Sequence, residues 1–148
     1  MKFDIEELLA ALPSKEGGDP RAPQAVFQRL KFLAQAMQGA EGQEGVGLLL
    51  RWLDQKGWKS RALPADGCPV TIGRDPACEV VLAGERVSRR HCLVRAVLSG
   101  GEIVDLDSAN GTLVNGSPLK AGALVLRDGD VIEVGGVPLA VVVGRGLG

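Results

Sequence analysis

The sequence predicts a mainly β protein, an antiparallel β-sandwich or barrel preceded by two short α-helices. From about residue 46 onward, apolar and β-branched runs recur between turn signals roughly every 8–12 residues, a spacing typical of antiparallel sandwiches and barrels. The 21 Gly and 8 Pro among the 148 residues supply these turns. Strands do not alternate with helices, as they would in a parallel sheet.

Two helices are expected near the N-terminus. A short helix is predicted over residues 4–12, where Asp4 can cap the first turn. A second is predicted from about Pro23 to Gln38, because Pro is tolerated in a first turn. Its predicted apolar stripe is Val26, Phe27, Leu30, Leu33, Ala34 and Met37. Two such helices are not stable alone. They therefore pack against the rest of the chain or serve as a flexible tether, or they contact a second copy or a partner, and the sequence leaves these alternatives open.

The remainder of the chain is predicted to be β-structure. The expected strands are Leu48–Leu53, Trp58–Leu63, Pro69–Ile72, Glu79–Leu82, Cys92–Leu98, Ile103–Leu106, Leu113–Val114, Leu124–Leu126, Val131–Val134 and Val137–Val143. This pattern divides the chain into an N-terminal helical segment and linker (1–45), a β-domain (46–144) and a short tail (145–148).

Composition argues against several classes of partner. The formal net charge is −1, from 17 basic and 18 acidic residues, and aromatic residues make up only 3%. Nucleic acid is therefore disfavoured. No apolar run approaches the ~20 residues needed to cross a bilayer, so no membrane partner is expected. The three cysteines are an odd number without paired spacing, which favours a reduced, cytoplasmic setting.

Three polar clusters lie beside predicted strand ends. They are Gly73-Arg74, Ser88-Arg89-Arg90-His91 and Ser108-Ala109-Asn110-Gly111-Thr112. Their side chains offer guanidinium forks, hydroxyls and an amide, which suit an anionic oxygen ligand and a peptide backbone better than bond-breaking chemistry.

Enzymatic and metal-binding alternatives have little support in the sequence. Ser88, His91 and Asp105 or Asp107 could be imagined as a triad, but no Gly-x-Ser-x-Gly elbow surrounds the serine. The cysteines and the single histidine form no ligand pair at zinc spacing. No nucleotide-binding glycine loop is present. We therefore expect no catalytic residue, no metal and no cofactor.

In order and spacing, these clusters resemble the forkhead-associated (FHA) domain. The segments that carry the resemblance are Thr71-Ile72-Gly73-Arg74, Val87-Ser88-Arg89-Arg90-His91, residues 107–116 and residues 126–132. The resemblance covers residues 46–144. It implies an eleven-stranded β-sandwich whose loops at one end bind a phosphothreonine peptide.

The resemblance also implies roles for particular residues. Arg74 would send its guanidinium to the phosphate, Ser88 would donate its hydroxyl and Arg89 would supply a second donor. Asn110 would hold the main chain of the ligand through its amide. The plain alternative for Arg74 is a surface ion pair with Asp75 or Glu85.

Further residues have secondary roles in the resemblance. Arg90 and position 109 are additional candidate contacts. Ala109 departs from the family, because many members have Thr there and its hydroxyl can also reach the phosphate. Structural support is expected from Gly73, His91, Gly111 and Thr112.

The implied function is that of an adaptor in Ser/Thr kinase signalling. Its partner would be a phosphothreonine-containing protein, either a substrate of such a kinase or the kinase itself. The alternative is a phosphate-independent scaffold that uses the sandwich faces or the N-terminal helices. Residues 1–45 contain no Thr, so they cannot place a phosphothreonine in the chain's own site.

Overall fold

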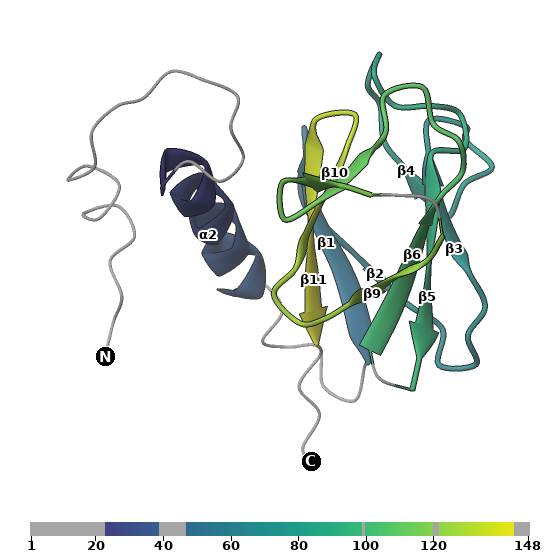
Figure 1. The fold of residues 1–148 in the computed structure, drawn as a ribbon, viewed down its shortest axis with the longest axis horizontal. Coiled ribbons are helices and arrows are strands. Elements are labelled where there is room, and N and C mark those ends of the chain that lie inside the picture. The colour runs from purple at the N-terminus through teal and green to yellow at the C-terminus, as the bar shows by residue number, and fades with distance from the viewer. Residues whose placement is uncertain (1–22, 39–46, 99, 120–121, 144–148) are drawn as a thin grey trace.

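The computed structural model describes residues 23–38, 47–98, 100–119 and 122–143. Within these ranges, eleven strands form two sheets, and one helix lies outside one of them (Figure 1). The helix predicted over residues 4–12 falls outside the described residues. None of the described helices is long and apolar enough to cross a membrane.

The two sheets differ in size. The six-stranded sheet contains β2 (Gly57–Ala62), β1 (Leu48–Asp54), β11 (Val137–Val143), β10 (Val131–Val134), β7 (Thr112–Val114) and β8 (Ser117–Pro118), in that order. The five-stranded sheet contains β4 (Val80–Val81), β3 (Val70–Gly73), β5 (Cys92–Val97), β6 (Gly100–Asp105) and β9 (Leu124–Leu126), in that order. No strand pairing among the described residues joins the two sheets, so the sandwich is open at its edges and is not a barrel.

Strand β1 shows how the layers are built. Its side chains alternate between faces. Leu48, Leu50 and Trp52 belong to the core between the sheets, whereas Leu49 packs on the outer face. Both faces of the strand are covered, and apart from Arg51 its buried residues are apolar.

The cover on the outer face is helix α2 (Pro23–Gln38), which lies beside β11 and β1 (Figure 1). Its fully buried residue is Ala36, with Phe32, Leu33 and Met37 partly buried around it. The sequence predicted the bounds of this helix correctly. The predicted stripe was wrong at Leu30, which is 38% exposed, because the buried face is centred on the row through Phe32 and Ala36. This apolar face is thus occupied by the chain's own sheet.

Most predicted strands are confirmed within two residues, but three features differ. β3 pairs with β4 in parallel, whereas the other pairs among the described residues are antiparallel. β8 was not predicted. β6 begins at Gly100 instead of Ile103, because its glycines let β9 approach closely. A Cβ on Gly100 would lie 2.6 Å from the Leu126 carbonyl oxygen.

The sheet register brings three connections to one end of the sandwich. Ile72 pairs with Cys92, and Cys92 pairs with Asp105. The end of β3, the start of β5 and the end of β6 are therefore neighbours. The β3–β4, β4–β5 and β6–β7 loops that follow or precede these points must lie together, and they contain the three polar clusters.

Candidate functional site

His91 ties the three loops together from inside. Its side chain is fully buried. Nδ1 accepts a hydrogen bond from the Ser88 backbone N–H (3.0 Å), and Nε2 donates to the Gly111 carbonyl oxygen (2.7 Å). This pattern places the ring proton on Nε2. Its backbone N–H donates to Ile72, and its carbonyl accepts from Leu106. Both ring nitrogens are engaged by backbone groups, so neither is available to the Ser88 hydroxyl, as a triad would need.

Ser88 and Asn110 link the β4–β5 loop to the β6–β7 loop. Ser88 Oγ accepts a hydrogen bond from the Ala109 backbone N–H at 3.0 Å. Asn110 Nδ2 donates to the Arg86 carbonyl oxygen at 3.0 Å. Each of these two side chains keeps hydrogen-bonding capacity beyond this bond. The Ser88 hydroxyl proton can still be donated, and Asn110 Oδ1 can still accept.

Arg74 stands at the end of β3 with an exposed side chain. Its backbone N–H donates to the Ser88 carbonyl oxygen at 3.0 Å, which fixes it beside that loop. The ion pair with Asp75 or Glu85 does not form. Asp75 Oδ1 instead accepts the Ala77 N–H. Within the described part of the chain, the Arg74 guanidinium has no hydrogen bond or ion pair, so it is available to an incoming anion.

The loop that holds the Arg74 backbone carries three further arginines. The side chains of Arg86, Arg89 and Arg90, on the neighbouring β4–β5 loop, are all exposed. The Arg89 carbonyl accepts hydrogen bonds from the Asp75 backbone N–H (3.1 Å) and the Cys78 thiol (3.3 Å). The backbone of this basic segment is thus held by the β3–β4 loop while its side chains point to solvent.

Two glycines support the loops for different reasons. A Cβ on Gly73 would lie 2.1 Å from the Arg89 carbonyl oxygen, so only glycine allows the two loops to meet. A Cβ on Gly111 would meet nothing within 4 Å, but its φ of +77° lies in the left-handed region. Gly73 is required for space and Gly111 for conformation.

Asp105 is a supporting residue that sequence reasoning missed, having weighed it only as a triad member. Its carboxylate accepts hydrogen bonds from Ser108 Oγ (2.6 Å), Thr112 Oγ1 (2.6 Å) and the Ser108 backbone N–H (3.0 Å). Burial acts to raise the pKa of Asp105, but these hydrogen bonds together outweigh it, and the pKa lies below its usual value. The network shapes the β6–β7 loop that presents Asn110. The hydroxyls three and seven positions after this Asp were the available signal.

The structure therefore brings Arg74, Ser88, Arg89 and Asn110 to one end of the sandwich, with Gly73, His91, Gly111 and Thr112 beneath or between them. The arrangement can bind an anion and a peptide backbone. Among the described residues, no group of three or more His, Cys, Asp or Glu could hold a metal ion.

Residues 70–135 match the family model of the FHA domain. A solved structure from a structural and functional analysis of phosphothreonine-dependent FHA domain interactions is 32% identical, with a TM-score of 0.58. The match covers 66% of this chain and 96% of that chain. The chain belongs to the FHA domain family.

A second FHA structure is also similar. The FHA domain of FhaA, solved in complex with the intracellular domain of another protein, is 33% identical with a TM-score of 0.56. The match covers 64% of this chain and 98% of that domain.

Two curated relatives are regulators by name. The glycogen accumulation regulator GarA of Mycolicibacterium smegmatis is 37% identical over 102 residues, which are 68% of this chain and 61% of GarA. The oxoglutarate dehydrogenase inhibitor of Corynebacterium glutamicum is 42% identical over 65 residues, 44% of each chain. This FHA chain thus spans about half the length of these relatives.

Proposed function

We propose that this FHA domain binds phosphothreonine peptides and acts as an adaptor in Ser/Thr kinase signalling, without catalysing a reaction. The observation that carries the proposal is the state of Arg74. Its guanidinium is exposed and has no partner among the described residues, and its backbone is fixed beside Ser88. An unpaired guanidinium whose backbone is held beside Ser88, together with a Ser88 hydroxyl proton that is free to be donated, suits a dianionic phosphate.

Each residue has a role in this binding. The fork of Arg74 meets two phosphate oxygens, and Ser88 donates its hydroxyl proton to the phosphate. Arg89 supplies a second donor, and Arg90 adds positive charge that attracts the ligand. Asn110, whose amide is already oriented by the Arg86 carbonyl, bonds to the peptide main chain.

Position 109 lacks the hydroxyl that many family members place there. Its backbone N–H still contributes, because it donates to Ser88 Oγ and so orients that hydroxyl toward the ligand. We therefore expect Ala109 to lower affinity by one hydrogen bond without abolishing binding. Replacing Ala109 with Thr would test this and should strengthen binding about fivefold.

The partner is inferred from the same chemistry. A phosphothreonine is made by a Ser/Thr kinase, so the bound protein would be a kinase substrate or the kinase itself. The similarity to an FHA structure from work on phosphothreonine-dependent interactions supports this partner class. The relatives named as a regulator and an inhibitor support a regulatory role without catalysis. We also propose a cytoplasmic location. Ser/Thr kinases act there, and the three unpaired cysteines suit a reducing environment.

The test is binding of a degenerate phosphothreonine peptide library, with its phosphoserine and unphosphorylated versions, to the full chain and to Arg74→Ala. We expect phosphate-dependent binding that the substitution weakens about 100-fold. Arg127→Ala is the control, because Arg127 is exposed on the β9–β10 connection, away from the three loops. If the wild-type chain binds no phosphorylated peptide, the proposal is wrong and the phosphate-independent scaffold takes its place.

A further inference from the structure

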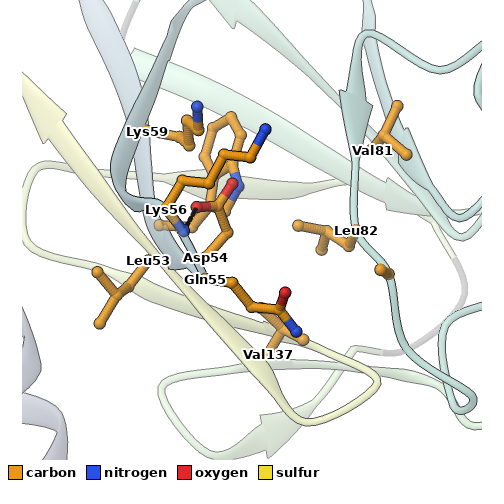
Figure 2. A pocket seen from close by; sticks show the side chains of 10 residues that line it. Leu53, Asp54, Gln55, Lys56, Lys59, Val81, Leu82 and Val137 are labelled. Atoms are coloured by element: carbon orange, nitrogen blue, oxygen red, sulfur yellow. Dashed lines mark hydrogen bonds between the residues drawn. The ribbon is translucent and has the colours of Figure 1, made fainter.

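A cleft of about 630 Å³ lies between the edges of the two sheets. We call it the sheet-edge cleft. Figure 2 shows Lys56 and Lys59 of the β1–β2 hairpin on one side and Val81 and Leu82 on the other, with Val137 at the start of β11. It is separate from Arg74, Ser88 and Asn110, none of which lines it.

Part of the lining of the sheet-edge cleft is apolar. Leu82 is buried, and Trp52, at 8% exposed, also lines the cleft. Val81 is 45% exposed although it is a valine in a strand. Covering such a partly exposed apolar surface with an apolar side chain of a ligand removes it from water and favours binding.

The hairpin side of the cleft is basic. Lys56 and Lys59 are exposed, and neither ammonium group has a hydrogen bond or ion pair with another described residue. One carboxylate, that of Asp54, also lines the cleft. Its Oδ1 already accepts the Lys56 backbone N–H at 2.7 Å, as Figure 2 shows. Two unpaired ammonium groups against one engaged carboxylate favour a negatively charged occupant.

Two strands that contribute to the lining of the cleft, β2 with Lys59 and β4 with Val81, are sheet edges. β2 is the outer strand of the six-stranded sheet, and β4 is the outer strand of the five-stranded sheet. Each has one side without a strand neighbour among the described residues. An extended peptide can add to a free strand edge, because its backbone groups can pair with those of the edge.

The sheet-edge cleft is joined to the loops of the candidate phosphate site. The Leu82 N–H donates to the Gly73 carbonyl oxygen at 2.9 Å, which connects the cleft wall to the residue before Arg74. The turn before Val137 also touches the β4–β5 loop. A Cβ on Gly135, whose φ is +56°, would lie 2.7 Å from the Arg86 backbone. One peptide could therefore contact both places.

We propose that the sheet-edge cleft binds a second segment of the phosphorylated partner, an extended stretch in which an Asp or Glu neighbours a large apolar residue. The acidic side chain pairs with Lys56 or Lys59, and the apolar one covers Val81 and Leu82. The inference rests on the proposed function and adds a source of specificity to it. Linking the two contacts in one chain strengthens both, because the second contact becomes intramolecular.

The experiment compares two phosphothreonine libraries on the full chain by fluorescence polarisation. A short library extends about four residues on each side of the phosphothreonine, a reach of roughly 13 Å, and a long one about twelve, roughly 40 Å. We expect the long library to select peptides with an acidic residue beside Leu, Ile or Phe. These should bind about tenfold more tightly than their trimmed forms.

Matched variants test whether the tighter binding of the long peptides comes from the sheet-edge cleft. Lys56→Glu and Val81→Ser should each remove most of the gain and leave the short peptides unaffected. The controls are Arg127→Glu, also a charge reversal at an exposed site, and Val125→Ser. Val125 is 45% exposed, like Val81, but lies in β9 at the opposite edge of the same sheet. The loss in Lys56→Glu should shrink in high salt, whereas the loss in Val81→Ser should not.

The outcomes separate this inference from the proposed function. If short peptides bind and Arg74→Ala abolishes binding, but long peptides gain nothing or the cleft variants do not reduce the gain, the inference is wrong and the proposed function stands. If neither library binds, both are wrong. If Lys56→Glu changes the oligomeric state in sedimentation instead of peptide affinity, the cleft binds a second copy and the inference is overturned.

Discussion

Two arginines occupy opposite situations in this molecule. Arg74, at the loop end, is exposed and has no side-chain partner among the described residues. Arg51, under helix α2, is 5% exposed and lies over the Trp58 ring at 5.3 Å, with Nη1 donating to Ser60 Oγ at 2.6 Å. The backbone of Arg74 is held by the Ser88 carbonyl oxygen, and its guanidinium is free within the described part of the chain. The guanidinium of Arg51 is packed on Trp58 and hydrogen-bonded to Ser60.

The surroundings explain the difference. Arg51 belongs to a packed layer in which Phe32 of α2 contacts Trp58, with ring centroids 5.5 Å apart. Burial lowers the pKa of the Arg51 guanidinium, and its Nε has no hydrogen-bond partner among the described residues. An arginine can therefore be a candidate ligand-binding residue at the loop end, as Arg74 is, and a packing residue on the helix-covered face, as Arg51 is. The neighbours, more than the residue type, decide the role.

The largest expected effect on stability and binding comes from placing a side-chain atom between the β3–β4 and β4–β5 loops. Gly73→Ala places a Cβ 2.1 Å from the Arg89 carbonyl oxygen, and backbone must move to admit it. We expect a loss of about 3 kcal/mol in the free energy of unfolding. Phosphopeptide binding should also be lost, because Arg74 and Arg89 are displaced. Urea unfolding and peptide titration measure the two effects.

Two other glycines sharpen this prediction. Gly111→Ala should cost about 1 kcal/mol, because only its left-handed backbone is strained. Gly47→Ala should be nearly neutral, since a Cβ there would meet nothing within 4 Å and its φ is not in the left-handed region. Equal stability of the Gly73 and Gly47 variants would contradict the close approach of the two loops.

The second prediction concerns Arg51. Arg51→Ala should destabilise the fold by about 2 kcal/mol, because it removes the contact with Trp58, the bond to Ser60 and the packing of the side-chain stem. Arg51→Met keeps the packing and should recover most of that loss. Neither variant should change phosphopeptide affinity. A weakened affinity without unfolding would mean that the helix-covered face and the loop end are coupled.

The sequence predicted much of the fold, and the exceptions have physical reasons. The bounds of α2, β9, β10 and β11 were correct because each has a clear apolar period with turn residues beside it. β8 was missed because Ser117-Pro118 has no apolar signal. The exposure of Leu30 could not be predicted, because the sequence of α2 contains adjacent apolar rows and does not show which of them packs against the sheet.

The candidate site was predictable only in part. The resemblance to the FHA family placed Arg74, Ser88 and Asn110 in one site, and the structure brings their loops together. The network around Asp105 was missed because Ser108 and Thr112 come within hydrogen-bonding distance of Asp105 only when the β6–β7 loop folds back. The sheet-edge cleft was missed for a similar reason. Its lining comes from four separate segments that no sequence motif connects.

The third prediction asks whether Arg74 acts as a fork or as a charge. Arg74→Lys keeps the positive charge but loses bidentate geometry, so affinity for phosphothreonine peptides should fall about tenfold, less than for Arg74→Ala. Arg127→Lys is the control and should bind as the wild type does. If Arg74→Lys binds with full affinity, the residue attracts the phosphate only as a charge, and the contrast with Arg51 lies in exposure alone.

The smallest expected effect is a pH dependence of the loop end. The pKa of Asp105 is lowered in the fold, whereas an unfolded Asp titrates near ~3.9. Its stabilisation is therefore fully present above that value and is lost as the pH falls through the lower folded-state pKa. Because the carboxylate is partly exposed, we expect less than about 1 kcal/mol from it.

Asp105→Asn tests this prediction. The variant should lose part of the acid-dependent fall in Tm below about pH 4. It should also bind phosphopeptides more weakly at neutral pH, since the bonds that shape the Asn110 loop are weakened. Asp66→Asn is the matched control. The pKa of Asp66 is also lowered, through hydrogen bonds from Cys68, but in a turn outside the three loops. A Tm profile of Asp105→Asn identical to wild type would show that Ser108 and Thr112 hold the loop without the charge, and the loop end would then depend on neutral hydrogen bonds alone.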